Sequence, residues 1–294
     1  MAIAPDLDPL AVRRQFARRA TTLHRADFIL RETERRMLER LEIGRLEPAR
    51  IVDVGCGLGH GLATLAQRYP NAALFGCDLA WPVVAQARRV LEPPTRGLLA
   101  RLRSRAAPPV ASVFAADAQA LPLPAASTDL VWSNLVFHWF VEPIRAVDEW
   151  YRVIRPNGLL SFTSLGVDSC VELRDAGARL MPFPDMHDIG DLLIASGFAE
   201  PVMDMERITL TYRDATALLA DVRALGGNAQ RGRFRGLVGR RERNDWIAAI
   251  ERARGSDGLL RLTLELIFGH AWCPAQKKLP DGLARINFVT RSKG

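Results

Sequence analysis

Residues 51 to 61 read IVDVGCGLGHG, and this stretch decides the fold class. Four glycines at alternate positions follow a short run that is β-branched and apolar apart from one aspartate, which is typical of a buried central strand. The glycines allow a backbone turn with no Cβ in the path of a ligand. The dinucleotide fingerprint G-x-G-x-x-G does not fit, because its third glycine falls on His60 or Leu62 in the two registers. The spacing therefore predicts a strand, a glycine turn against a small molecule, and a helix.

Strands and helices alternate after this turn. The patterns predict strands over 50–54, 72–78, 112–117, 129–134 and 159–165, with helices over about 60–68, 81–91 and 143–154 between them. Further along, they predict a helix around 187–196, one long or two short strands over 201–212, a helical basic segment over 214–256 and an edge strand over 259–272. The expected fold is α/β: a doubly wound, mostly parallel, seven-stranded Rossmann-like sheet with a helical insertion before the last strand.

Four segments follow from these patterns. An amphipathic helix over 24–41 precedes the first strand. We predict an N-terminal helical cap over 1–44, a core over 45–212, a basic helical insertion or lid over 213–258, and the last core strand with a C-terminal tail over 259–294.

Charge and composition narrow the partners. The chain has 294 residues, 48% of them hydrophobic and 25% charged, and a net charge of +7. Basic residues concentrate over 13–25 and 231–245, which favours an acidic partner, or else marks a solvated helical face. Aromatic residues are not interleaved with the basic ones as a base-stacking surface requires, so we expect no nucleic-acid partner.

Membrane, export and metal signals are absent from the sequence. No stretch approaches the ~18 uncharged apolar residues of a membrane span, and the N-terminal region has no apolar signal segment. We therefore expect a cytoplasmic protein with no membrane partner. The four cysteines form no C-x-x-C pair and have no histidine at zinc spacing, so we expect no metal site. Cys56 and Cys77 are expected to be buried thiols.

Acidic residues lie at the ends of successive predicted strands. Asp53 would favour an ammonium group beside the glycine turn and disfavour a pyrophosphate. Asp78, 19 residues beyond Gly59, can accept hydrogen bonds from both hydroxyls of a ribose. Asp117 ends the third predicted strand, where it can bind an adenine amino group. Each carboxylate alone could instead cap a helix. Together they predict a nucleoside ligand with a cationic or zwitterionic tail.

Four motifs carry a family resemblance. DVGCGLG, GCDLA, AADAQALPLPAASTDLVWSN and YRVIRPNGLLSFT together resemble the class I S-adenosylmethionine-dependent methyltransferases over about residues 45–165. The resemblance implies S-adenosyl-L-methionine as the cofactor, with the methionine tail along the glycine turn, the ribose on Asp78 and the adenine at Asp117. The cofactor-binding residues that it implies are Asp53, Gly55, Gly57, Gly59, Asp78, Leu79, Asp117, Ala118 and Asn134.

A finer resemblance covers the rest of the chain. DLVWSNLVFHW, RAVDEWYRVIRPNGLLSFTSLGVDSCVEL, HDIGDLLIASGF, DVRALGGNA and LTLELIFGHAW are similar to the malonyl-acyl-carrier-protein O-methyltransferases of biotin synthesis. They also resemble a mitochondrial complex I assembly factor of the same fold, associated with arginine hydroxylation. After FARRA, where the biotin enzymes usually show a tyrosine near the cofactor, this chain has Leu23 and His24.

The implied reaction methylates the free carboxylate of a malonyl group on an acidic acyl carrier protein. That carboxylate is ionised at pH 7, so no general base is required, and the sequence shows no Ser-His-Asp or Cys-His arrangement. An arginine is the expected clamp for the carboxylate, although the sequence does not single one out. His138 and Trp139 would either wall the acceptor pocket or form an aromatic core contact. The 213–258 insertion would either cover the acceptor and dock the carrier, or only cover the site.

Two other classes of function stay open at this point. One is another methyltransferase, or a hydroxylase on the methyltransferase fold, that acts on a different protein or a small molecule. The other is a non-catalytic assembly or binding module that keeps the cofactor.

Overall fold

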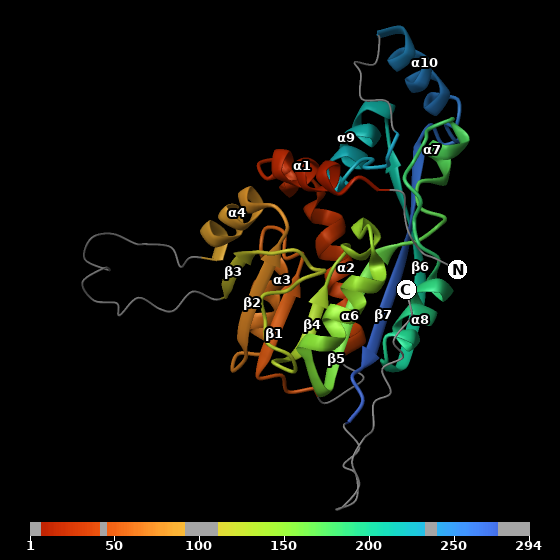
Figure 1. The fold of residues 1–294 in the computed structure, drawn as a ribbon. Coiled ribbons are helices and arrows are strands. Elements are labelled where there is room, and N and C mark those ends of the chain that lie inside the picture. Colours follow the sequence, from red (N-terminus) through yellow and green to blue (C-terminus); the bar gives the residue numbers. More distant parts are fainter. Residues whose placement is uncertain (1–6, 42–45, 92–110, 233–239, 276–294) are drawn as a thin grey trace, which may run out of the picture.

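The computed structural model describes residues 7–41, 46–91, 111–232 and 240–275. Within these ranges seven strands form one sheet in the order β3-β2-β1-β4-β5-β7-β6 (Figure 1). The strands are β1 (Arg50–Val54), β2 (Ala73–Asp78), β3 (Ser112–Ala115), β4 (Thr128–Ser133), β5 (Ile154–Leu165), β6 (Ala199–Tyr212) and β7 (Leu260–Trp272). The predicted seven-stranded, doubly wound sheet is confirmed.

The strand order reverses between β1 and β4: the chain runs from β1 to β2 and β3 on one side, and then returns to β4 and β5 on the other. β1 pairs in parallel with β2 on one side and β4 on the other, and the chain builds outward both ways from this pair. Ligands of open α/β sheets bind at such a switch point, outside the carboxyl ends of the strands. The glycine turn follows β1 and therefore lies at that point.

One expectation about the sheet was wrong. The 259–272 strand, β7, is not an edge strand: it lies between β5 and β6 and is antiparallel to both. Its residues are mostly buried along its whole length, as an interior strand requires, whereas β6 alternates between half-buried and exposed positions as an edge strand does. The stretch 201–212 forms part of one long strand rather than two.

The helices predicted over about 60–68, 81–91, 143–154 and 187–196 are present. The helix predicted over 24–41 is divided into a short 3-10 helix and an α-helix, and the helices over 9–19, 137–139 and 171–175 were not predicted individually. The described helices are α1 (Pro9–Arg19), η1 (Leu23–Ala26), α2 (Asp27–Arg40), α3 (His60–Arg68), α4 (Trp81–Leu91), η3 (Phe137–Trp139), α6 (Pro143–Val153), α7 (Val171–Asp175), α8 (Met186–Ala195), α9 (Ala215–Leu225) and α10 (Arg240–Glu251). The helical stretch predicted over 214–256 is thus divided into α9 and α10, and residues 233–239 between them lie outside the described residues.

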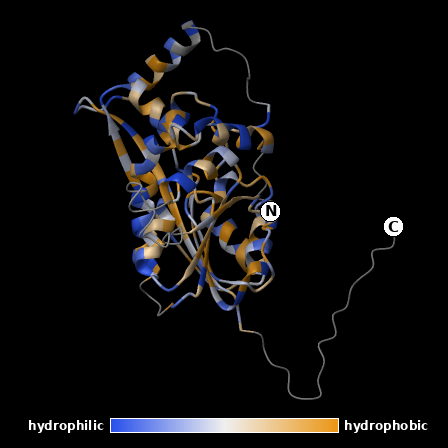
Figure 2. Ribbon diagram, turned by 90° about the vertical axis from the view of Figure 1, so that its left-hand side faces the viewer, coloured by the Kyte–Doolittle hydropathy of each residue, from blue (hydrophilic) through white to orange (hydrophobic). Residues whose placement is uncertain are grey.

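Hydrophobic side chains hold helices against both faces of the sheet. One buried cluster includes Trp132, Leu62 and Val84, and the other includes Trp150, Val147 and further residues of α6. Figure 2 shows hydrophobic residues running along the strands, with hydrophilic ones on the outer sides of the helices. None of the described helices is long and apolar enough to cross a membrane.

A set of long-range hydrogen bonds fastens α1 to the turn after α9. Asp8 caps α1 with its carboxylate and donates its own backbone N–H to Ala229 O over 2.9 Å. Arg231 Nε donates to Leu7 O over 2.9 Å, and the side chain of Arg19 donates to Gly226 O. These bonds hold α1 and α9 near each other, above the upper ends of the strands in Figure 1. We call them the α1 latch.

Candidate functional site

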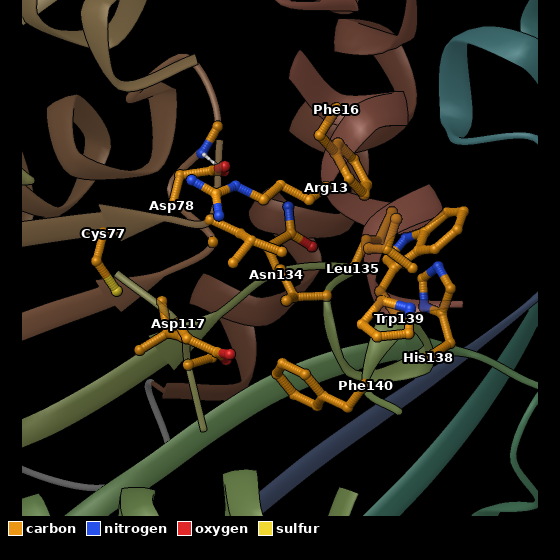
Figure 3. Close-up of a pocket in the computed structure, with 18 of the residues that line it drawn as sticks. Arg13, Phe16, Cys77, Asp78, Asp117, Asn134, Leu135, His138, Trp139 and Phe140 are labelled. Atoms are coloured by element: carbon orange, nitrogen blue, oxygen red, sulfur yellow. Dashed lines mark hydrogen bonds between the residues drawn. The ribbon is translucent and has the colours of Figure 1, made fainter. Parts of the chain in front are cut away.

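A cavity of about 290 Å³ lies at the carboxyl ends of the strands, between the glycine turn and α1 (Figure 3). Several residues predicted from the sequence line it together: Gly55, Gly57, Asp78, Leu79, Asp117, Ala118, Asn134, His138 and Trp139. They come from four separate strand ends, which the fold brings to one place. The remaining predicted residues, Asp53 and Gly59, do not line the cavity.

The glycine turn is held against the end of β2. The backbone N–H groups of Gly55 and Cys56 both donate to Cys77 O, over 2.7 and 2.9 Å. Gly55 has φ +77°, and a Cβ there would lie 2.2 Å from Val136 Cγ2. Gly57 has φ +52°, and the nearest atom to the place of its missing Cβ is a Leu23 methyl at 3.7 Å. The backbone at Gly57 is therefore open to a ligand at close range.

Asp78 presents a half-buried carboxylate to this cavity. Its Oδ1 accepts a hydrogen bond from Ala80 N at 2.9 Å, and its Oδ2 accepts one from Gly57 N at 3.3 Å. Burial raises the pKa of Asp78 to about 6, against the opposing effect of these two hydrogen bonds. A carboxylate has about four acceptor sites, so two backbone donors leave room for paired hydroxyl groups.

Asp117 and Asn134 lie at strand ends on either side of Asp78: β3 neighbours β2, and β4 is separated from β2 by β1. Asp117 is exposed and follows β3, because that strand ends at Ala115, two residues earlier than predicted. Its Oδ1 accepts from Gln119 N at 2.9 Å and from Gln119 Nε2 at 3.3 Å. Asn134 Nδ2 donates to Leu30 O, and Asn134 Oδ1 accepts from Thr163 Oγ1, each over 2.8 Å. Asn134 therefore ties this cavity wall to α2 and β5.

Asp53 lies behind the glycine turn rather than in the cavity. It is 3% exposed, and burial raises its pKa well above the usual range, with further contributions from the charges of Glu34 and Asp78. Gly59 precedes α3 at φ +82°, where a Cβ would meet Leu91 at 2.9 Å. The cofactor-binding roles of these two residues stay predictions.

Cys56 and Cys77 are buried and free, as expected, and burial raises the pKa of both thiols. Among the described residues no three His, Cys, Asp or Glu side chains are grouped so as to hold a metal ion.

The N-terminal cap supplies lining residues that sequence reasoning missed. Arg13 and Phe16 of α1 reach into the cavity in Figure 3, and Leu23 of η1 lines it as well. The signal for this helix was Asp8 followed by Pro9, an N-cap with proline at the first helical position. Leu23, at the departure from the biotin enzymes, is thus a wall of the cavity beside Gly57.

His138 and Trp139 form the far wall, in the short helix η3. Trp139 is 8% exposed and packs edge-on against Phe16, with ring centroids 5.2 Å apart. His138 is 3% exposed, and its Nδ1 accepts a hydrogen bond from Leu165 N at 3.2 Å. Burial lowers the pKa of His138 to about 3, so its ring is neutral at pH 7. Both residues are core contacts that also line the cavity. Their place in an acceptor pocket stays a prediction.

Comparison with solved structures agrees on the fold. The chain is similar to one in the Haloferax volcanii complex containing the Trm112 methyltransferase activator, with a TM-score of 0.57 and 16% identity over 91% of this chain and 100% of that chain. It is also similar to the YcgJ protein of Bacillus subtilis, with a TM-score of 0.54 and 15% identity over 81% of this chain and 97% of that one. These likenesses show a shared architecture.

Sequence comparison is more specific. Residues 52–162 match the family described as a methyltransferase domain. The chain is 43% identical to the malonyl-[acyl-carrier protein] O-methyltransferase of Laribacter hongkongensis over 96% of both proteins. It is 41% identical to the enzyme of that name from Methylovorus sp., over 97% of this chain and 96% of the relative. The chain therefore belongs to the malonyl-[acyl-carrier protein] O-methyltransferase family.

Proposed function

We propose that this protein transfers the methyl group of S-adenosyl-L-methionine to the free carboxylate of malonyl-acyl carrier protein, an early step of biotin synthesis. The observation that carries the proposal is one continuous cavity with two chemically different walls. Acidic strand ends suited to a nucleoside form one wall, and the aromatic, uncharged pair His138 and Trp139 forms the other. The near full-length similarity to enzymes of that name supports the choice of acceptor.

The residues present fit the cofactor. Asp78 would accept hydrogen bonds from the ribose hydroxyls, Asp117 would lie at the adenine amino group, and the open backbone at Gly57 would face the methionine tail. When bound, S-adenosyl-L-methionine supplies an electrophilic methyl group on a positively charged sulfur.

The proposed reaction moves no proton. A carboxylate oxygen would bond to the methyl carbon while the carbon–sulfur bond breaks and its electron pair stays on the sulfur. The negative charge of the carboxylate and the positive charge of the sulfonium would disappear in the same step. The protein has to hold the two reacting atoms about 3 to 3.5 Å apart and keep water out. A buried, neutral His138 suits this chemistry, because no general base is needed.

Intact-protein mass spectrometry tests the proposal directly. The enzyme is incubated with the cofactor and malonyl-loaded carrier, and we expect a gain of one methyl group on the carrier. Acetyl-loaded carrier should gain nothing, because acetyl has no free carboxylate. No gain on malonyl carrier, with cofactor binding still measurable by calorimetry, would rule out this acceptor and point to a different protein or small molecule.

Arg13 is the candidate for the arginine that binds the carboxylate of the acceptor. It extends from α1 into the cavity in Figure 3, and among the described residues it is the one arginine that lines it. We expect Arg13→Met to lower kcat/KM for malonyl carrier about tenfold, since a hydrogen bond to a charged group contributes about 1.5 kcal/mol or more. Steady-state kinetics with calorimetry checks this. A loss confined to cofactor affinity would instead place Arg13 on the carboxylate of the methionine tail.

The outer face of α1 is proposed to dock the acidic carrier. Arg14 and Arg18 are exposed on the same helix that carries Arg13 into the cavity. We expect the double charge reversal Arg14→Glu/Arg18→Glu to raise KM for malonyl carrier about fivefold at low salt, because it removes long-range attraction to an acidic surface. A small malonyl thioester without the carrier should be methylated as before. Arg145→Glu on α6, also exposed, is the control; equal effects there would contradict docking on α1.

A further inference from the structure

His138 has one ring nitrogen committed to the protein and one facing a cavity. The backbone N–H of Leu165 donates to Nδ1 at 3.2 Å, so Nδ1 carries no hydrogen. Because burial keeps the ring neutral, its single hydrogen is on Nε2. Nε2 has no hydrogen-bond partner among the described residues. It is not completely enclosed by protein atoms either, so a molecule in the cavity can reach it.

The imidazole is fixed in orientation by its neighbours. Trp139 lies beside it with ring centroids 5.3 Å apart, and Phe183 meets it on another side at 5.8 Å. With Nδ1 held by the end of β5, the ring cannot rotate without losing that hydrogen bond. The Nε2–H group is therefore a pre-positioned donor rather than a mobile one.

This donor stands where two cavities adjoin. His138, Trp139, Leu165 and Leu225 line both the large cavity and a second, smaller one. The other residues that line the second cavity have apolar side chains, apart from one glycine that contributes its backbone. They are Cys170, Leu180, Met181, Phe183, Val222, Gly227 and Leu264. No charged side chain lines the smaller cavity, and the side chains with ring N–H groups that line it are His138 and Trp139. An acceptor oxygen that reaches this place can accept a hydrogen bond from the Nε2–H group of His138.

We propose, on the basis of the proposed function, that His138 is an acceptor-binding residue: Nε2–H donates a hydrogen bond to an oxygen of the malonyl thioester and thereby orients the malonyl group toward the methyl group. Leu165 N–H, by holding Nδ1, fixes the tautomer that makes this possible. His138 contributes a directed hydrogen bond and no proton transfer.

Two substitutions separate this role from a structural one. The side-chain amide of glutamine reaches about as far as Nε2, so His138→Gln keeps a donor for the substrate. The side-chain oxygen of asparagine occupies about the place of Nδ1, so His138→Asn keeps the acceptor for Leu165 N–H but loses the donor. His138→Leu removes both.

The experiment measures kcat and KM for malonyl carrier, with cofactor affinity by calorimetry and thermal unfolding as checks on each variant. We expect His138→Gln to stay within about threefold of the natural enzyme in kcat/KM, and His138→Asn and His138→Leu to lose about tenfold, the loss of one directed hydrogen bond. Cofactor affinity should be unchanged in all three.

The reverse order, with Asn active and Gln impaired, would show that His138 only supports Leu165 and would overturn the inference. Equal activity in all variants would overturn it too, while leaving the methyl transfer itself intact. A natural enzyme that binds the cofactor but never methylates malonyl carrier would instead remove the proposed function, and this inference with it.

Discussion

Replacing Asp78 with alanine should weaken the binding of S-adenosyl-L-methionine by up to about 3 kcal/mol, or roughly 150-fold, because a half-buried carboxylate that accepts hydrogen bonds from two hydroxyls is lost. Its two backbone donors, Ala80 N and Gly57 N, would also lose their acceptor. Isothermal calorimetry measures the affinity. Asp117→Ala is a useful comparison, since that carboxylate is exposed and should matter less. Unchanged affinity in Asp78→Ala would mean that the ribose lies elsewhere.

The same residue should make cofactor binding depend on pH. Burial raises the pKa of Asp78 to about 6, and the ionised form is the one that accepts from both ribose hydroxyls. Affinity should therefore be full above about pH 7 and fall as the pH decreases through 6. Titrations between pH 5 and 7 should show this dependence in the natural protein and not in Asp78→Asn. A dependence that persists in Asp78→Asn would belong to Asp53 or Glu34, whose pKa values burial also raises.

Replacing Gly226 with alanine should destabilise the fold or displace Trp139, which lines the proposed acceptor site. A Cβ at this position would lie 1.9 Å from Trp139 Cζ2, and Gly226 has φ +142°, which side chains disfavour. Trp139 is held against Phe16 and has little room to move. Overpacking and backbone strain together should cost roughly 3 kcal/mol of folding free energy. If the ring shifts instead, misplacing the acceptor should lower kcat/KM about 100-fold.

A second glycine variant is the control that separates backbone strain from displacement of the Trp139 ring. Gly258→Ala also places a side chain at a positive φ, +76°, but nothing lies within 4 Å of the place of its missing Cβ. It should lose some stability and keep its activity. Thermal unfolding and kinetics on both variants are needed. If Gly226→Ala folds and methylates normally, Trp139 is a passive core residue and not a wall of the acceptor site.

The parallel half of this fold could be predicted from local patterns. A β-branched strand, a glycine turn and an acidic strand end are signals written in neighbouring residues, and they placed Gly57, Asp78 and Asp117 correctly around one cavity. The position of β7 was harder, because strand order depends on which faces are covered. In the structure β7 is buried along most of its length, whereas β6 alternates between half-buried and exposed positions. The sequence hides this difference, because Arg261, Thr263 and Glu265 alternate with leucines in the first half of β7 as in a half-exposed strand.

The contribution of α1 could not be predicted in the same way. A helix start at Asp8 and Pro9 is visible in the sequence, but nothing local says that Arg13 or Phe16 will face the glycine turn. That arrangement depends on bonds such as the one between Asp8 N and Ala229 O, which join residues far apart in the chain. His138 was found from its place after a strand, whereas its tautomer required the structure, because Leu165 lies on another strand.

The α1 latch also bears on how the protein is made. Leu7 and Arg231, which it joins, are separated by 224 positions. Residues of α1 and α9, two segments far apart in the chain, therefore line the cavity together. Contacts between residues so far apart form late, since a large loop must close first. During synthesis the glycine turn and Asp78 leave the ribosome long before Arg231. The growing chain should therefore acquire its strands before it can enclose a cofactor, and binding becomes a marker of completed folding.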